Sequence, residues 1–149
     1  KRGMGTTCTL GVIRGSFLFV AHIGDSRGYL FRDGVLRRIT DDHSVVEEEV
    51  RRGLLTPEQA WADPRRNIIT KAIGLDYDPE VDTKCVELRS GDRIMFCSDG
   101  LNSMITDQEI GSILNQGDVA SLVQALIDAA NDAGGSDNIT VVVADTPTK

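Results

Sequence analysis

The stretch "RIMFCSDGLNSMITDQEI" (residues 93–110) carries an aspartate out of an apolar run and directly into a flexible turn. Residues 94–98 have the composition of a buried β-strand, and the run stops at Asp99-Gly100. An acid at the end of a core strand is costly unless something offsets its charge. The stretch therefore predicts a strand that delivers a carboxylate to its end, followed by a helix whose capping box covers residues 106–109.

The composition describes one soluble globular domain. The chain has 149 residues, of which 40% are hydrophobic and 26% charged, so it is long enough to bury a sizeable core. Its formal net charge of −7 argues against a nucleic-acid partner or an anionic membrane surface. A negative net charge is better suited to binding metal ions at clustered acids, or a cationic partner.

Cysteine usage and hydropathy bear on the compartment. Cys8, Cys85 and Cys97 lie far apart in apolar runs, without zinc-ligand spacing, and are expected to be buried free thiols. The longest apolar stretch, residues 17–21, is far shorter than the roughly 20 residues that span a bilayer. Together these features predict a cytoplasmic protein with no membrane segment in this chain.

Short runs of β-branched and aromatic residues, separated by turn signals, predict the strands. The first forty residues are typical of a β-meander with strands over 7–13, 16–23, 27–31 and 35–40. The runs 83–88 and 93–98, joined by Ser90-Gly91-Asp92, predict another hairpin. The continuous β-branched run 138–145 predicts a central strand.

Helical signals fall between these strands. A short charged helix is expected over 43–53, a second from the capping box at 56–59, a third from 106 to about 115, and a fourth from Asp118 to Gly134. Strands in blocks with helices grouped between them predict an α+β fold with mainly antiparallel sheets.

Three aspartates share one context. Asp25, Asp99 and Asp137 each stand where an apolar strand meets a turn, next to glycine or asparagine. Carboxylates held together at one rim of a sheet repel one another unless a cation neutralises them, and Mg²⁺ and Mn²⁺ prefer such oxygen ligands. Ordinary turn chemistry is the alternative for each acid taken singly.

Five motifs give the chain a family resemblance. It resembles the type 2C metal-dependent Ser/Thr protein phosphatases, and the bacterial members most, over nearly its whole length. The motifs occur in the family's order and are GMGTT (3–7), HIGDSRGYLFRDG (22–34), ITDDHS (39–44), RIMFCSDGL (93–101) and GGSDNITVVV (134–143).

The resemblance implies a β-sandwich of mainly antiparallel sheets flanked by helices, with metals at one end. By the same resemblance, Asp99 and Asp137 would ligate two catalytic Mg²⁺ or Mn²⁺ ions, and Asp25 a third, weaker ion. A metal-activated water would attack phosphorus directly, without a phosphoenzyme. The family's phosphate-binding arginine and remaining ligands would belong to an N-terminal part that this sequence does not include.

Residues 45–67 are similar to a mobile flap beside the metals in the bacterial relatives. Arg65 and Arg66 could contact a phosphorylated substrate there; solvated surface charge is the alternative. His22, His43 and Cys97 match no catalytic pattern and are expected to be structural.

The resulting prediction is a bacterial phosphoprotein phosphatase acting on phosphoserine and phosphothreonine, opposing a Ser/Thr kinase in signalling. Residues 1–149 would be the C-terminal major part of one phosphatase domain, cut from a longer chain because they begin Lys1-Arg2-Gly3 without methionine, and inactive alone. Two alternatives stay open: a non-catalytic regulatory relative of the same fold, and a simple divalent-metal-binding module. The absence of an EF-hand loop counts against the second.

Overall fold

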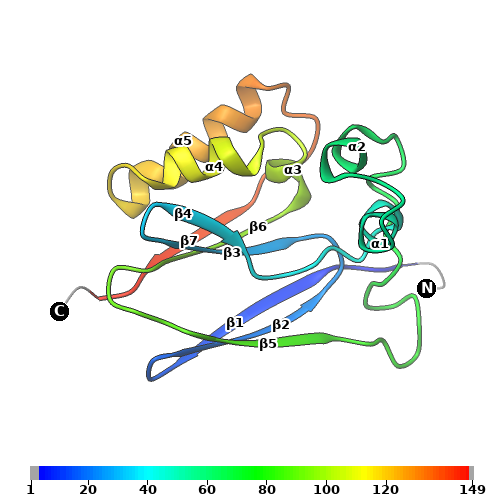
Figure 1. The fold of residues 1–149 in the computed structure, drawn as a ribbon, viewed down its shortest axis with the longest axis horizontal. Coiled ribbons are helices and arrows are strands. Elements are labelled where there is room, and N and C mark those ends of the chain that lie inside the picture. Colours follow the sequence, from blue (N-terminus) through cyan, green and yellow to red (C-terminus); the bar gives the residue numbers. More distant parts are fainter. Residues whose placement is uncertain (1–3, 148–149) are drawn as a thin grey trace.

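Two antiparallel sheets packed face to face form the body of the molecule (Figure 1). The computed structural model describes residues 4–147. One sheet has the strand order β1-β2-β5, and the other β4-β3-β6-β7. The strands are β1 (Cys8–Arg14), β2 (Phe17–Ile23), β3 (Arg27–Arg32), β4 (Val35–Arg38), β5 (Asp82–Glu87), β6 (Arg93–Cys97) and β7 (Val141–Asp145).

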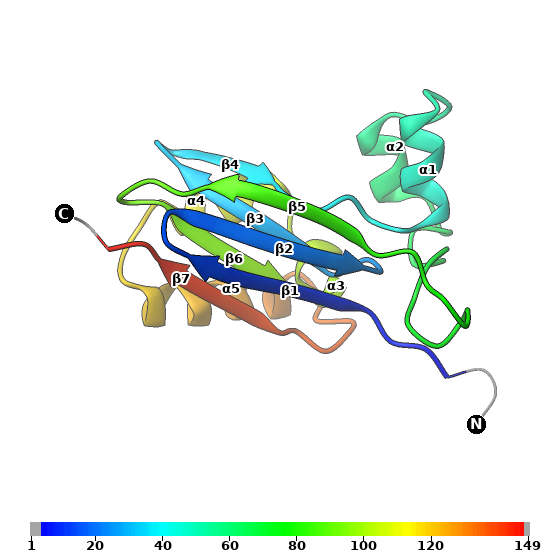
Figure 2. The ribbon, with the colours of Figure 1, turned by 90° about the horizontal axis from the view of Figure 1, so that it is seen from below.

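Helices cover one outer face and one end of this sandwich. They are α1 (Val45–Arg51), α2 (Pro57–Ala62), α3 (Asp99–Asn102), α4 (Asp107–Leu114) and α5 (Val119–Asp132). The helices α4 and α5 lie on the outer face of the β4-β3-β6-β7 sheet, whereas α1 and α2 stand at the end of the sandwich (Figures 1 and 2). None of the helices within residues 4–147 has the length and apolarity needed to cross a membrane.

The core has two layers, and β3 and β6 contribute to both. Tyr29 and Met95 point toward the helices and pack with residues such as Leu126, while Leu30 and Ile94 point toward the other sheet. Side chains alternate between the two faces of a strand, so a strand buried on both faces needs a continuous apolar run. That is why residues 94–98 include no charged side chain, and the next charged residue is Asp99.

The predicted starts of α2, α4 and α5 are confirmed, whereas α1 begins at Val45, after its N-cap Ser44, and not at residue 43. Thr56 and Thr106 each accept a hydrogen bond from the backbone N–H three residues on, and Gln59 and Glu109 complete the two capping boxes. Asp118 caps α5 through the N–H groups of residues 120 and 121. The short helix α3, which begins at Asp99, was not expected from the sequence.

The predicted hairpin between β5 and β6 is wrong. β5 pairs with β2 in one sheet, whereas β6 pairs with β3 and β7 in the other. The turn that joins them crosses between the sheets, and Asp92 in this turn binds the Arg32 guanidinium of β3. A second crossing, through residues 24–26, separates β2 from β3, so the expected meander is two hairpins in different sheets.

Two further expectations need correction. Among residues 4–147, β7 lies at the edge of its sheet rather than at the centre, and Val142 is 56% exposed. Of the three free thiols only Cys97 is buried, because Cys8 and Cys85 lie on exposed positions of the β1-β2-β5 sheet. Gly3, the first residue of the GMGTT motif, falls outside the described residues.

Candidate metal centre

The Ser-Asp-Gly and Asp-Asn segments are fastened together at the end of β6. Ser98 exchanges backbone and side-chain hydrogen bonds with Thr140, and its Oγ donates to the carbonyl of Asn138 at 3.1 Å. A Cβ on Gly100 would lie 2.4 Å from that same carbonyl oxygen, so only glycine allows this approach. Asp99 and Asp137, which flank these contacts, are therefore carried to the same end of the sandwich.

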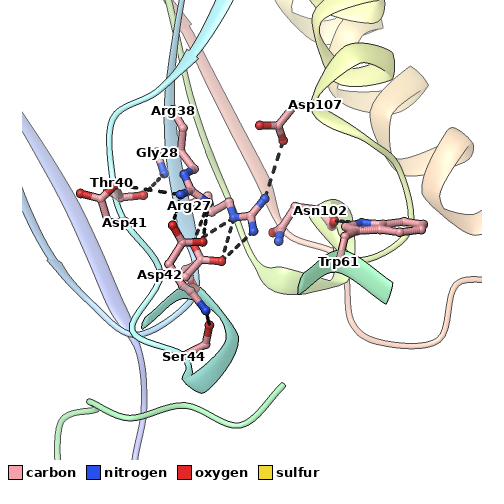
Figure 3. Close-up of polar contacts among 12 residues, drawn as sticks. Arg27, Gly28, Arg38, Thr40, Asp41, Asp42, Ser44, Trp61, Asn102 and Asp107 are labelled. Atoms are coloured by element: carbon pink, nitrogen blue, oxygen red, sulfur yellow. Dashed lines mark hydrogen bonds and ion pairs between the residues drawn. The ribbon is translucent and has the colours of Figure 1, made fainter. Parts of the chain in front are cut away.

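Asp25 reaches that end from the turn between β2 and β3. The segment 39–44 runs alongside residues 24–28 and holds them by several hydrogen bonds (Figure 3). The Arg27 guanidinium donates to both carboxylate oxygens of Asp42 at 2.7–3.0 Å, and the Thr40 hydroxyl accepts from the N–H of Gly28 at 2.9 Å. The GDSR and ITDDHS motifs thus form one structural unit that fixes the Asp25 turn.

Asp99 is electrostatically linked to both Asp25 and Asp137. Burial, followed by the nearby Asp99 carboxylate, raises the pKa of Asp25 to about 6. Burial, followed by Asp137, also raises the pKa of Asp99. Asp99 is therefore close enough to interact with both of the others, as a shared rim requires. None of the ion pairs within residues 4–147 involves any of these three carboxylates.

The donor set fits a hard divalent cation, although it does not enclose one. Three carboxylates without histidine or cysteine are oxygen ligands of the kind that Mg²⁺ and Mn²⁺ prefer, and such ions retain waters when few protein ligands are present. In the described part of the chain, no three or more His, Cys, Asp or Glu side chains converge closely enough to form a complete metal site. Asp25, Asp99 and Asp137 therefore lie along a rim rather than around a closed cage.

A cavity of about 580 Å³ opens beside this rim. Its floor includes Asp25 and Asp99, but Asp137 does not line it. The opposite wall comes from the segment over 45–67 that the sequence resemblance identified as a flap. This wall is mixed: its apolar residues are Val46, Val50, Pro57, Ala60 and Trp61, and its polar or charged residues are Glu47, Glu58, Arg66 and Asn67.

The flap contacts the rim through Trp61. The indole Nε1–H donates to the carbonyl of Asn102, in the helix that Asp99 begins, at 3.3 Å (Figure 3). The Arg66 guanidinium lies over the indole ring at 5.9 Å and donates to the Trp61 carbonyl at 3.1 Å. Trp61 therefore connects the flap to the opposite side of the cavity.

The two arginines proposed to contact substrate lie in different surroundings. Arg66 lines the cavity, as described above. Arg65 instead pairs with Asp63 and Glu49, each at 2.8 Å, within the flap itself. Its charge is therefore already engaged in an exposed intraflap network.

Sequence reasoning missed several cavity residues. Arg27, Arg38 and Asp42 line it as a connected cluster, in which Arg38 also pairs with Glu47 at the start of α1. Burial lowers the pKa of the Arg27 guanidinium, but its hydrogen bonds and charge interactions, led by those with the Asp42 carboxylate, together raise the pKa more. Arg27 therefore stays a cation. The sequence shows the GDSR and ITDDHS motifs but not that they pair with each other. Their pairing, which builds this cluster, is seen only in the structure.

Fold and rim together define a class: β-sandwich proteins that carry a candidate divalent-cation site at one end, beside a cavity. The comparisons with known proteins narrow that class. The family description "Protein phosphatase 2C" matches residues 2–52. The serine/threonine phosphatase stp of Listeria monocytogenes is 40% identical over 144 residues, which are 96% of this chain and 57% of the relative.

Solved structures agree with this match. The serine/threonine phosphatase PstP/Ppp of Mycobacterium tuberculosis superimposes with a TM-score of 0.93 at 44% identity, over 98% of this chain and 62% of that one. A structure of the PstP catalytic domain in complex with two manganese ions gives a TM-score of 0.88 at 43% identity, over 97% of this chain and 60% of that one. Over nearly its whole length, the chain is similar to serine/threonine phosphatases, and its first third matches the protein phosphatase 2C family. It spans 57% of the length of the Listeria relative.

Proposed function

We propose that the full-length protein is a metal-dependent phosphatase that hydrolyses phosphoserine and phosphothreonine in proteins. The observation that carries the proposal is the rim formed by Asp25, Asp99 and Asp137, three interacting carboxylates without a described ion-pair partner, beside a cavity. The Listeria relative is named a serine/threonine phosphatase, and the similar PstP structure holds two manganese ions, which supports the same chemistry here.

Each part of the rim has a role in this proposal. Asp99 and Asp137 would hold two ions, Mg²⁺ or Mn²⁺, and Asp25 would hold a third. Ions bound there would supply a water of lowered pKa and positive charge beside the phosphoryl oxygens. The Ser98 contacts and the close approach of Gly100 to Asn138 hold the two aspartate segments together, which supports a site whose ligands need little rearrangement to bind an ion.

The cavity beside the rim would receive the peptide around the phosphorylated residue. Its flap wall offers apolar surface at Val46, Val50 and Trp61 and a cation at Arg66. A guanidinium is suited to a phosphate or a neighbouring acidic group. The substrates would be the products of a Ser/Thr kinase, and we propose a cognate kinase and a cytoplasmic location for the protein.

The test uses the full-length protein and a phosphothreonine peptide. We expect hydrolysis that requires Mg²⁺ or Mn²⁺ and stops with a chelator. Asp99→Asn should lower the rate by about two orders of magnitude or more, because it removes a ligand. Asp132→Asn, an exposed aspartate of α5 outside the cavity, is the matched control and should leave the rate unchanged.

The same measurements discriminate the alternatives. A protein that binds Mn²⁺ with Asp99-dependent affinity but never releases phosphate would be a metal-binding module or a regulatory relative. A rate that is independent of metal, or unaffected by Asp99→Asn, would contradict the proposed mechanism. Titrating Mg²⁺ and Mn²⁺ separately would establish which ion supports turnover, and the stoichiometry would show whether a third ion binds.

A further inference from the structure

A buried histidine satisfies both backbone groups of the glycine that precedes Asp25. The ring Nδ1 of His43 accepts a hydrogen bond from the N–H of Gly24 at 3.1 Å, and the His43 N–H donates to the Gly24 carbonyl at 2.7 Å. His43 is only 1% exposed, so water does not compete for these bonds. Gly24 has a φ of 111°, a conformation open to glycine and disfavoured for other residues.

The remaining polar groups of His43 are directed at other segments. Because Nδ1 accepts, the ring carries its proton on Nε2, which lies 3.3 Å from a carboxylate oxygen of Asp82 in β5 but makes no hydrogen bond within the described residues. The His43 carbonyl accepts from the N–H of Thr70, just after the flap, at 2.7 Å. His43 is therefore a junction between the Asp25 turn and the base of the flap.

This junction matters because glycine alone does not define the direction of the next residue. The peptide between Gly24 and Asp25 can rotate with little steric resistance, and a rotation would move the Asp25 carboxylate away from Asp99. Each hydrogen bond from His43 restrains one backbone group of Gly24. A ligand held by a fixed backbone binds a cation more tightly, since less conformational freedom is lost on binding.

We propose that His43 is a positioning residue for the cation site at Asp25: its Nδ1 fixes the Gly24 backbone so that the Asp25 carboxylate stays beside Asp99. The inference rests on the proposed function, in which Asp25 is a metal ligand. The inference goes beyond the proposed function by assigning a role to a side chain, His43, that would touch neither metal nor substrate. A histidine that merely filled core volume would be replaceable by any apolar residue of similar size.

Two substitutions separate positioning from packing. Asn places its Oδ1 acceptor where His carries Nδ1, so His43→Asn keeps an acceptor for Gly24, whereas His43→Leu keeps apolar volume and loses it. His22 is the matched control, because it is 2% exposed, its ring lies 5.0 Å from that of His43, and its own hydrogen bonds go to Thr9 and Asp41. His22→Leu removes a buried imidazole without touching Gly24.

The readout is Mn²⁺ affinity of the full-length protein by calorimetry, with the relevant site defined as the one that Asp25→Asn removes. We expect His43→Leu to weaken that site about 10- to 100-fold, His43→Asn to remain within about threefold of wild type, and His22→Leu to leave it unchanged. Amide hydrogen exchange in metal-free wild-type protein gives a second readout, in which the Gly24 N–H should be strongly protected.

The outcomes distinguish failure of the proposed function from failure of the inference about His43. Wild-type protein that binds no Mn²⁺ and hydrolyses no phosphopeptide would overturn the proposed function together with this inference. Normal Mn²⁺ binding by wild type that His43→Leu does not change, or that His43→Asn weakens as much as His43→Leu, would overturn the inference alone. If His43→Leu does not fold, His43→Asn and the Gly24 exchange rate still decide, because rapid exchange contradicts the restraint.

Discussion

Asp92 shows how one buried side chain can hold two sheets together. Only 1% of its side chain is exposed, and its carboxylate accepts from the Arg32 Nε at 2.7 Å and from the N–H of Arg89 at 2.7 Å. Arg32 belongs to β3, whereas Asp92 lies in the turn between β5 and β6. The ion pair therefore fixes the place where the chain crosses from one sheet to the other.

Replacing this carboxylate should destabilise the fold. Asp92→Asn leaves the Arg32 guanidinium without its anionic partner, and we expect the free energy of unfolding to fall by about 1.5–3 kcal/mol in urea denaturation. Asp145→Asn is the matched control, because its pair with Arg93 is exposed (42% for Asp145), and it should cost less than about 1 kcal/mol. Equal losses in the two variants would contradict the assigned role.

The same residue predicts a pH dependence. Hydrogen bonding to Arg32 holds the pKa of Asp92 below its usual value in the folded protein. A carboxyl whose folded pKa is depressed contributes stability above its unfolded pKa of about 4 and loses it as the pH falls through the folded pKa. The difference in unfolding free energy between wild type and Asp92→Asn should therefore be constant near neutral pH and shrink below about pH 4. A difference that grew on acidification would have the wrong sign.

Elements with local signals were predictable from the sequence, and elements whose partners are distant were not. The capping boxes at Thr56 and Thr106 depend on residues three apart, so their helix starts can be read directly. The pairing of β5 with β2 rather than β6 depends on segments some sixty residues apart, and a short turn between two strands does not specify that both join one sheet. Periodicity indicates a strand without naming its neighbour.

The α4 cap gives a prediction at this scale. Thr106→Ala removes the hydroxyl that accepts from the Glu109 N–H, and we expect a loss of about 1 kcal/mol in the free energy of unfolding. Ser112→Ala, on the exposed side of the same helix, is the control and should change it by less than about 0.5 kcal/mol. Similar values for the two variants would show that the cap contributes nothing specific.

The flap predicts a split between two neighbouring arginines. Arg66→Glu should raise the KM of the full-length enzyme for a phosphopeptide by about fivefold, because a cavity cation becomes an anion. Arg65→Glu should change KM less, since Arg65 pairs with Asp63 and Glu49 inside the flap. Steady-state kinetics on both variants measures this, and an unchanged KM in Arg66→Glu would remove the flap from substrate binding.

At the scale of the whole molecule, convergence at the rim was predictable only as a hypothesis. Asp25, Asp99 and Asp137 share a local context, but 112 positions separate the first from the last. Their approach depends on Gly100 meeting the carbonyl of Asn138, a contact without a local sequence signal. The cavity was not predictable either, because Trp61 and Asn102 line it from elements that meet only after folding.

The rim also predicts how much activity residues 1–149 retain by themselves. No group of three or more ligands converges within the described residues, so we expect these carboxylates to bind ions too weakly for efficient turnover. The polypeptide of residues 1–149 should therefore hydrolyse p-nitrophenyl phosphate with Mn²⁺ at less than about 1% of the rate of the full-length protein. Circular dichroism would verify that the shorter chain is folded when it is assayed. Robust, Mn²⁺-dependent turnover by that folded chain would show that Asp25, Asp99 and Asp137 suffice as ligands, and would contradict the expectation that further ligands are required.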